Sequence, residues 1–98
     1  MKDLANMIVL AASDNVGIAL RGIGVGDTAV SGDGRRIACT EEIPQGHKLA
    51  VERIAEGQKL IRFGIAVGIA RSVIMPGALA HVHNVRSQYL DNDEDHYE

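Results

Sequence analysis

A seven-residue pattern, Ile-x-x-Gly-x-x-apolar, occurs four times in this chain of 98 residues and restricts its fold more than any other feature. The glycines of the four copies are Gly26, Gly46, Gly57 and Gly77. Their spacings of 20, 11 and 20 residues align residues 23–49 with residues 54–80 at an offset of 31. Because glycine makes up 11 of the 98 residues, chance recurrence is the alternative explanation. The matched spacing favours an internal duplication.

A glycine three residues after an isoleucine suits a tight turn. In two copies Pro44 or Pro76 stands between them, where proline presets a negative φ and glycine accepts the positive φ of a type II turn. Short runs of Ile, Val, Leu and Ala follow the turns at residues 49–51, 60–61 and 80–85, and such runs are typical of short strands. The sequence therefore predicts a mostly β domain of two related β units around an aliphatic core.

One short helix is predicted over residues 15–21, ahead of the repeats. Ser13 or Asp14 would cap it by accepting its first free backbone N–H groups, and Gly22 would end it. Two turns of helix need a sheet to pack on, and residues 7–10 are predicted to form a buried first strand. The alternative is that Asp14 and the residue after it form a polar site near a turn.

The acidic residues are concentrated at the C-terminal end of the chain. Of the 13 acids, five fall within residues 91–98, which contain no Lys or Arg, and the other 8 accompany 10 bases in residues 1–90. We expect residues 1–86 to form the folded domain and residues 87–98 to be an acidic flexible tail or linker.

Composition excludes several classes of protein. The apolar runs are far shorter than the roughly 20 residues that cross a bilayer, so we expect no membrane partner. The chain has no basic cluster and only three aromatic residues, which argues against binding of nucleic acid. Cys39 is the only cysteine, and we expect it to be a small buried side chain in a cytoplasmic, reducing setting.

Histidine gives the one concentrated chemical signal. His81 and His83 fall two apart in a predicted strand, where side chains at that spacing share a face. His47 follows the second turn, and a pseudo-twofold packing of the two units would bring it close to them. Three neutral imidazoles are donors that iron, manganese or zinc accept. The alternative is a polar pair of histidines that faces solvent.

Basic side chains are the other candidates for binding. Lys48, Arg53, Arg62 and Arg71 could hold the carboxylate of an acidic substrate, because arginine binds carboxylates with two parallel hydrogen bonds. Their spread along the chain favours the alternative, a solvated basic surface.

Several short motifs together resemble a known family. In chain order they are Asp14-Asn15-Val16, Ile43-Pro44-Gln45-Gly46-His47-Lys48, Phe63-Gly64 with Val67-Gly68-Ile69-Ala70, and His81-Val82-His83-Asn84-Val85. The combination resembles the N-terminal, SAF-type domain of the altronate and galactarate dehydratases over residues 7–86. The small subunit of sulfolactate sulfo-lyase belongs to the same set.

The resemblance implies a β-clip fold that acts with a much larger catalytic subunit or domain. Such an enzyme removes water across C2–C3 of a hexonate-type sugar acid and needs a divalent metal, usually Fe²⁺ or Mn²⁺. Carried onto this sequence, the resemblance makes His47, His81 and His83 candidate metal ligands, unless the large subunit holds the metal. His47, Lys48 and Asn84 would contact substrate or the subunit interface.

Which residues carry out catalysis is left open by the resemblance. The chain alone is not expected to be active, because it shows no general acid–base pair within a deep pocket. A sulfolactate sulfo-lyase subunit and a non-catalytic β-clip binding module are the alternatives. Exposed strand edges make a homodimer a further expectation.

Overall fold

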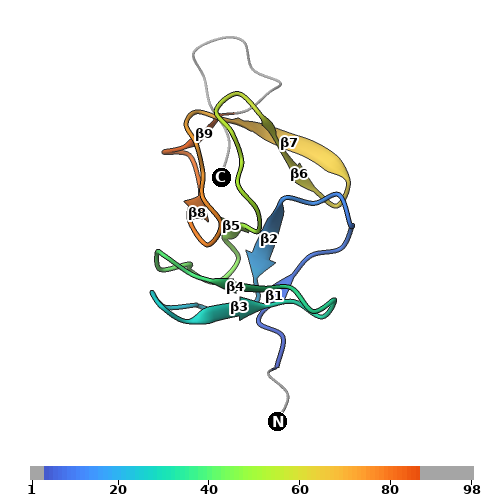
Figure 1. The fold of residues 1–98 in the computed structure, drawn as a ribbon, viewed down its shortest axis with the longest axis vertical. Helices are drawn as coiled ribbons and strands as arrows, with labels where there is room; N and C mark the ends of the chain where they lie inside the picture. Colours follow the sequence, from blue (N-terminus) through green and yellow to red (C-terminus); the bar gives the residue numbers. More distant parts are fainter. Residues whose placement is uncertain (1–3, 87–98) are drawn as a thin grey trace.

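The computed structural model describes residues 4–86, and these form nine strands in three sheets with antiparallel pairing (Figure 1). The strands are β1 (Met7–Ile8), β2 (Val16–Ala19), β3 (Thr28–Val30), β4 (Arg36–Ala38), β5 (Lys48–Ala50), β6 (Lys59–Arg62), β7 (Ile65–Ala70), β8 (Leu79–Ala80) and β9 (Val85–Arg86). The sheet orders are β1-β2-β5-β8, β3-β4 and β6-β7-β9. The predicted β class is confirmed.

The described part of the chain contains no helix, and hence none that could cross a membrane. The hairpins β3-β4 and β6-β7 lie toward opposite ends of the molecule, with β2 and β5 between them (Figure 1). The acidic segment 87–98 lies outside the described residues.

All four glycines of the repeated pattern form the predicted turns. Their φ angles are 87° at Gly26, 82° at Gly46, 84° at Gly57 and 88° at Gly77, a region that side chains with a Cβ rarely enter. In each turn, the N–H of the residue that follows the glycine donates to the carbonyl of the residue two positions before the glycine, at 2.9 to 3.1 Å. Local sequence therefore sets these turns.

The isoleucines of the pattern pair across each unit. Ile23 and Ile43 exchange two backbone hydrogen bonds at 2.9 and 2.8 Å, and Ile54 and Ile74 do the same at 2.8 Å. All four side chains are at most 2% exposed. Since the second pair follows the first at the offset of 31 (23 to 54, 43 to 74), the predicted two-unit architecture is confirmed.

Each unit has its own aliphatic core, and the two cores correspond. Six positions of the first cluster recur 31 residues later in the second; the pairs are Ala19/Ala50, Ile23/Ile54, Ala29/Leu60, Cys39/Ala70, Ile43/Ile74 and Leu49/Ala80. The first unit is filled additionally by Met7, and the second by Val16 and Val85. Aliphatic packing therefore supplies the core, as the near absence of aromatic residues predicted.

The helix predicted over residues 15–21 is wrong, because this segment contains strand β2. Val16 pairs with Ala50 of β5, and Ala19 pairs with Met7 of β1. Gly17 lies so close to Met7 that a Cβ there would be 2.6 Å from its sulfur. Pairing with strands on both sides satisfies the backbone groups that a lone two-turn helix would leave open.

The strand predicted over residues 80–85 is also wrong as a single element. Strand β8 ends at Ala80, a turn occupies residues 81–84, and β9 begins at Val85. The N–H groups of Asn84 and Val85 both donate to the His81 carbonyl at 2.9 Å. The chain thereby leaves the sheet of β5 and joins the sheet of β7.

Candidate functional site

His47 and His81 lie side by side, although 34 residues separate them (81 − 47). Their ring centroids are 4.9 Å apart, with the ring planes tilted by 50°. His47 follows the glycine turn that leads into β5, and His81 follows β8. Because β5 and β8 pair with Lys48 opposite Ala80, the two histidines emerge at one end of that strand pair.

The two imidazoles line a small pocket of about 140 Å³ together with Gly46 and Lys48. Gly46 contributes no side chain, and its positive φ lets the chain turn sharply before His47. The predicted convergence of the segments after Gly46 and Gly77 is therefore found for one histidine of each unit. This pocket, called the histidine pocket below, is the candidate functional site.

His83 does not line the histidine pocket. It lies exposed on the turn over residues 81–84, so the shared strand face expected for it and His81 does not exist. Within residues 4–86, no three His, Cys, Asp or Glu side chains group closely enough to hold a metal ion. Two imidazoles are fewer donors than a four-coordinate protein site requires. The described residues of this chain thus do not form a complete metal site.

Lys48 is the buried cation of the pocket, at 8% exposed. Burial lowers the pKa of Lys48, and the nearby positive charge of Arg62 lowers it further. Arg62 itself lies with its guanidinium 5.0 Å from the centre of the Phe63 ring. A lysine held in this way gives up its proton more readily than an exposed one, which suits proton transfer as well as binding of an anion.

The other predicted cations do not join the pocket. Arg53 and Arg71 are exposed, and Arg71 donates from Nε to the Val85 carbonyl at 3.3 Å.

Cys39 is buried at 2% exposure, as predicted, and burial raises the pKa of its thiol.

Asn84 is the last residue of the turn that carries His81, and it is buried. Its Oδ1 accepts the His81 backbone N–H at 2.9 Å, and its Nδ2 donates to the Leu79 carbonyl at 2.8 Å. Both ends of the carboxamide are therefore engaged with the backbone of the segment that enters the turn.

Asp14 and Asn15 do not cap a helix; they hold the β6-β7 hairpin. Asp14 accepts the Gly64 N–H at 2.8 Å, at the hairpin tip where Phe63 has a φ of 56°. Asn15 donates to the Lys59 carbonyl at 3.0 Å. Asp14 does lie beside a turn, the tip of the β6-β7 hairpin, and the polar site proposed as the alternative stays a prediction.

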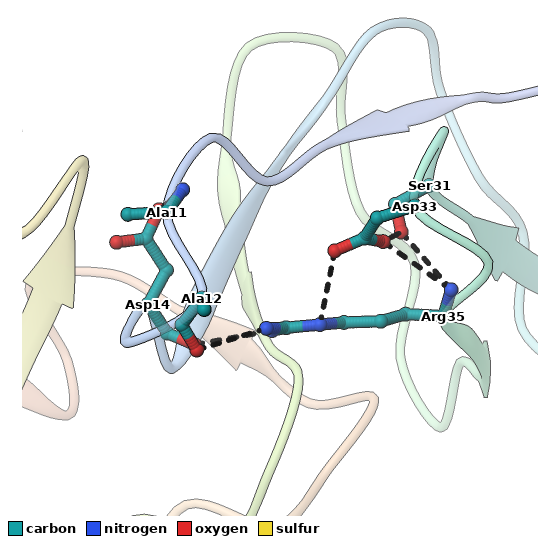
Figure 2. Close-up of polar contacts among 6 residues, drawn as sticks. All are labelled: Ala11, Ala12, Asp14, Ser31, Asp33 and Arg35. Atoms are coloured by element: carbon teal, nitrogen blue, oxygen red, sulfur yellow. Dashed lines mark hydrogen bonds and ion pairs between the residues drawn. The ribbon is translucent and has the colours of Figure 1, made fainter.

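Arg35 fixes the other side of the loop that carries Asp14 (Figure 2). Its Nη1 and Nη2 donate to the carbonyls of Asp14 and Ala12, each at 3.1 Å, and its Nε pairs with Asp33 at 3.4 Å. Asp33 in turn accepts from the Ser31 hydroxyl. Nothing in the sequence links residues 12–14 with residue 35, so this cluster could not be predicted from it.

Comparison with known proteins identifies the family. The family model of the altronate/galactarate dehydratase SAF domain matches residues 5–88. The chain is 35% identical over 91 residues to altronate dehydratase of Escherichia coli (strain K12), which is 93% of this chain and 18% of that protein. It is 32% identical over 88 residues to altronate dehydratase of Bacillus subtilis (strain 168), which is 90% of this chain and again 18% of that protein.

A relative with another activity is also found. Over 48 residues the chain is 38% identical to subunit alpha of (2R)-sulfolactate sulfo-lyase from Chromohalobacter salexigens, covering 49% of this chain and 51% of that subunit. The fold and the family match together define a SAF domain. The chain belongs to the SAF domain family of the altronate and galactarate dehydratases, and it spans 18% of the length of the altronate dehydratases that it matches.

Proposed function

We propose that this chain is the SAF domain of a sugar-acid hydro-lyase, and that its histidine pocket forms one wall of an active site completed by a larger catalytic region. The observation that carries the proposal is the convergence of His47 and His81, from different β units, beside the buried Lys48. A cationic amine and two imidazoles can bind a carboxylate and exchange protons with it.

The larger region is part of the proposal because this pocket is too small for the whole reaction. At about 140 Å³ it lies below the roughly 300 Å³ at which pockets for small ligands usually begin. It can therefore receive one end of a hexonate, with the remaining groups of the substrate bound elsewhere. The relatives named as altronate dehydratases support a larger partner region, since this chain covers 18% of their length.

Removal of water across C2–C3 begins with abstraction of the proton beside the carboxylate. Negative charge then builds on that carboxylate, and positively charged groups placed there stabilise it in the transition state. We assign this electrostatic role to Lys48, with His47 and His81 as hydrogen-bond partners of the same carboxylate. The group that abstracts the proton would come from the larger region.

The proposal includes a divalent metal, Fe²⁺ or Mn²⁺. Such an ion would need ligands from the larger region in addition to those that this chain can supply. When bound, such an ion would stabilise the same negative charge as a Lewis acid. In that case His47 and His81 would supply two of its nitrogen donors in place of their hydrogen bonds to the carboxylate, and the larger region would supply the others. Location in the reducing cytoplasm is proposed as well, in accord with the free, buried thiol of Cys39.

The second candidate is a sulfo-lyase, which would expel sulfite in place of water. The relative named as (2R)-sulfolactate sulfo-lyase subunit alpha supports it over 48 residues. Both candidates use an acid substrate and proton abstraction beside a carboxylate, so the histidine pocket serves either.

Reconstitution distinguishes the two. The chain is combined with its larger catalytic region, and altronate, galactarate and sulfolactate are offered separately with Mn²⁺ or Fe²⁺. We expect a 2-oxo-3-deoxy sugar acid from altronate or galactarate, and no sulfite from sulfolactate. Release of sulfite would favour the second candidate, and turnover that is equally fast without this chain would contradict an active-site role.

A further inference from the structure

We infer that Asn84 is a positioning residue that fixes His81 beside His47, and that it does not itself contact the substrate. The inference rests on the proposed function for the reason that His81 must be fixed. The hydrogen bonds that fix it lie within this chain alone. It gives Asn84 a different role from the substrate or interface contact expected from sequence.

The Asn84 side chain forms hydrogen bonds with the backbone at the start of the turn over residues 81–84. Its Oδ1 holds the His81 N–H at 2.9 Å, and its Nδ2 holds the Leu79 carbonyl at 2.8 Å. The backbone closes the same turn, because the Asn84 N–H donates to the His81 carbonyl at 2.9 Å. The His81 backbone is thus bound to Asn84 through both its N–H and its carbonyl.

Asn84 is itself anchored to a different sheet. Its carbonyl accepts the Arg71 N–H at 2.7 Å, and the next residue, Val85, pairs with Ala70 of β7. The residues before the turn belong instead to β8, where Leu79 pairs with Leu49 of β5. Asn84 therefore ties the position of His81 to both sheets at once.

Of these bonds, the one that the His81 N–H donates to Asn84 Oδ1 acts on His81 most directly. A carboxylate in the same place retains this acceptor, but it cannot donate to the Leu79 carbonyl. Alanine loses both bonds. Comparison of Asn84→Asp with Asn84→Ala therefore separates the effect of the acceptor at Oδ1 from the effect of the donor at Nδ2. In both variants the positive-φ turn at Gly46 continues to place His47.

The test uses the full 98-residue chain labelled with ¹⁵N histidine, and it reads the ring nitrogens by long-range ¹H–¹⁵N correlation. In the wild type, His47→Ala should shift the ring signals of His81, because the two rings are 4.9 Å apart. We expect this shift to persist in the Asn84→Asp background and to vanish in the Asn84→Ala background.

Asn6→Ala is the matched control. Asn6 also makes two side-chain hydrogen bonds to backbone, at Thr28 and Val30, but it lies away from the histidine pocket. It should lower the melting temperature without altering the effect of His47→Ala on His81.

Persistence of the shift in a folded Asn84→Ala chain would overturn the inference. Loss of the shift in Asn6→Ala as well would do the same, since general destabilisation would then explain both. If Asn84→Ala does not fold, loss of the shift in Asn84→Asp is the contradicting result. None of these readouts depends on turnover, so failure of the proposed function would be seen separately, in the reconstituted enzyme.

Discussion

Asn6 and Asn15 each make the same two side-chain hydrogen bonds, Asn6 in the first β unit and Asn15 in the second. Each donates from Nδ2 to a backbone carbonyl, at 3.1 and 3.0 Å, and each accepts a backbone N–H at Oδ1, both at 2.7 Å. The side-chain partners are Thr28 and Val30 for Asn6, and Lys59 and Ile61 for Asn15. These partners are related by the offset of 31 (28 to 59, 30 to 61), but the asparagines are only nine residues apart (15 − 6).

The first strand of each unit therefore comes from one continuous N-terminal segment. Asn6 precedes β1 and Asn15 precedes β2, and their backbones bond to Val30 and Ile61 in the same way. Two equivalent strands thus enter the two units in succession before the duplicated segments begin. The two asparagines therefore fall outside the offset of 31 that relates their partners.

Replacing either asparagine by alanine should destabilise the fold. Loss of two side-chain hydrogen bonds to strand backbone is expected to lower the free energy of unfolding by about 1–3 kcal/mol. The effect should be larger for Asn15→Ala, because Asn15 is buried and Asn6 is only partly so. Urea denaturation measures both values, with the exposed Gln45→Ala as a control expected to stay within about 0.5 kcal/mol of wild type. A neutral Asn15→Ala would contradict the role assigned to it.

Substitution of Gly77 should destabilise the fold more than substitution of Gly57. Both have a positive φ, but a Cβ at Gly77 would lie 2.1 Å from the Ala38 carbonyl oxygen, and one at Gly57 would meet nothing within 4 Å. Gly57→Ala therefore carries only backbone strain, of the order of 1 kcal/mol. Gly77→Ala adds a clash with backbone that has little freedom to move. We expect a clearly lower melting temperature for Gly77→Ala, and equal losses in the two variants would contradict the close approach of Gly77 to Ala38.

Asp14 should contribute to acid sensitivity. Burial acts to raise the pKa of Asp14, but hydrogen bonds from backbone N–H groups, that of Gly64 foremost, hold the pKa below its usual 3.8. A carboxyl with a depressed pKa in the fold stabilises it above the unfolded value, and this stability is lost as pH falls through the folded value.

Asp14→Asn should therefore flatten the decline of stability below about pH 4. Stability is measured by urea denaturation from pH 2 to pH 7, with the exposed Asp27→Asn as the control. An unchanged decline in Asp14→Asn would show that other groups govern acid unfolding.

Lys48 should cost the domain stability while serving the active site. Its pKa is lowered in the fold, so the unfolded chain retains the proton to higher pH, and stability should rise as pH increases from the folded pKa to the unfolded one. Lys48→Met is expected to raise the free energy of unfolding at pH 7 and to remove this alkaline rise. In the reconstituted enzyme the same substitution should weaken turnover by tenfold or more (about 1.4 kcal/mol). The exposed Lys59→Met should change neither quantity.

Sequence predicts local features of this fold well. The φ preference of glycine is a local property, so the spacing of Gly26, Gly46, Gly57 and Gly77 was enough to place four turns and two related units. The convergence of His47 with His81 followed from that duplication.

Features that depend on partners distant in the chain could not be predicted. Residues 15–21 carry a plausible cap and a terminating glycine, but pairing of β2 with β1 and β5 outweighs them. The run over residues 80–85 is interrupted because Val85 pairs with Ala70 of β7, in a different sheet from β8, and the chain must turn between the two sheets. His83 consequently lies exposed on the turn and does not line the pocket to which the expected strand would have brought it.

The central claim is that His47 and His81 act together in a shared active site, and kcat/KM of single-histidine variants tests it most directly. His47→Ala, His81→Ala and His83→Ala are each combined with the larger catalytic region and assayed on the substrate that wild type turns over. We expect losses of at least about tenfold for His47→Ala and for His81→Ala, a double variant little worse than either single one, and a His83→Ala enzyme close to wild type. Wild-type kcat/KM in the double variant, or a loss confined to His83→Ala, would contradict the account.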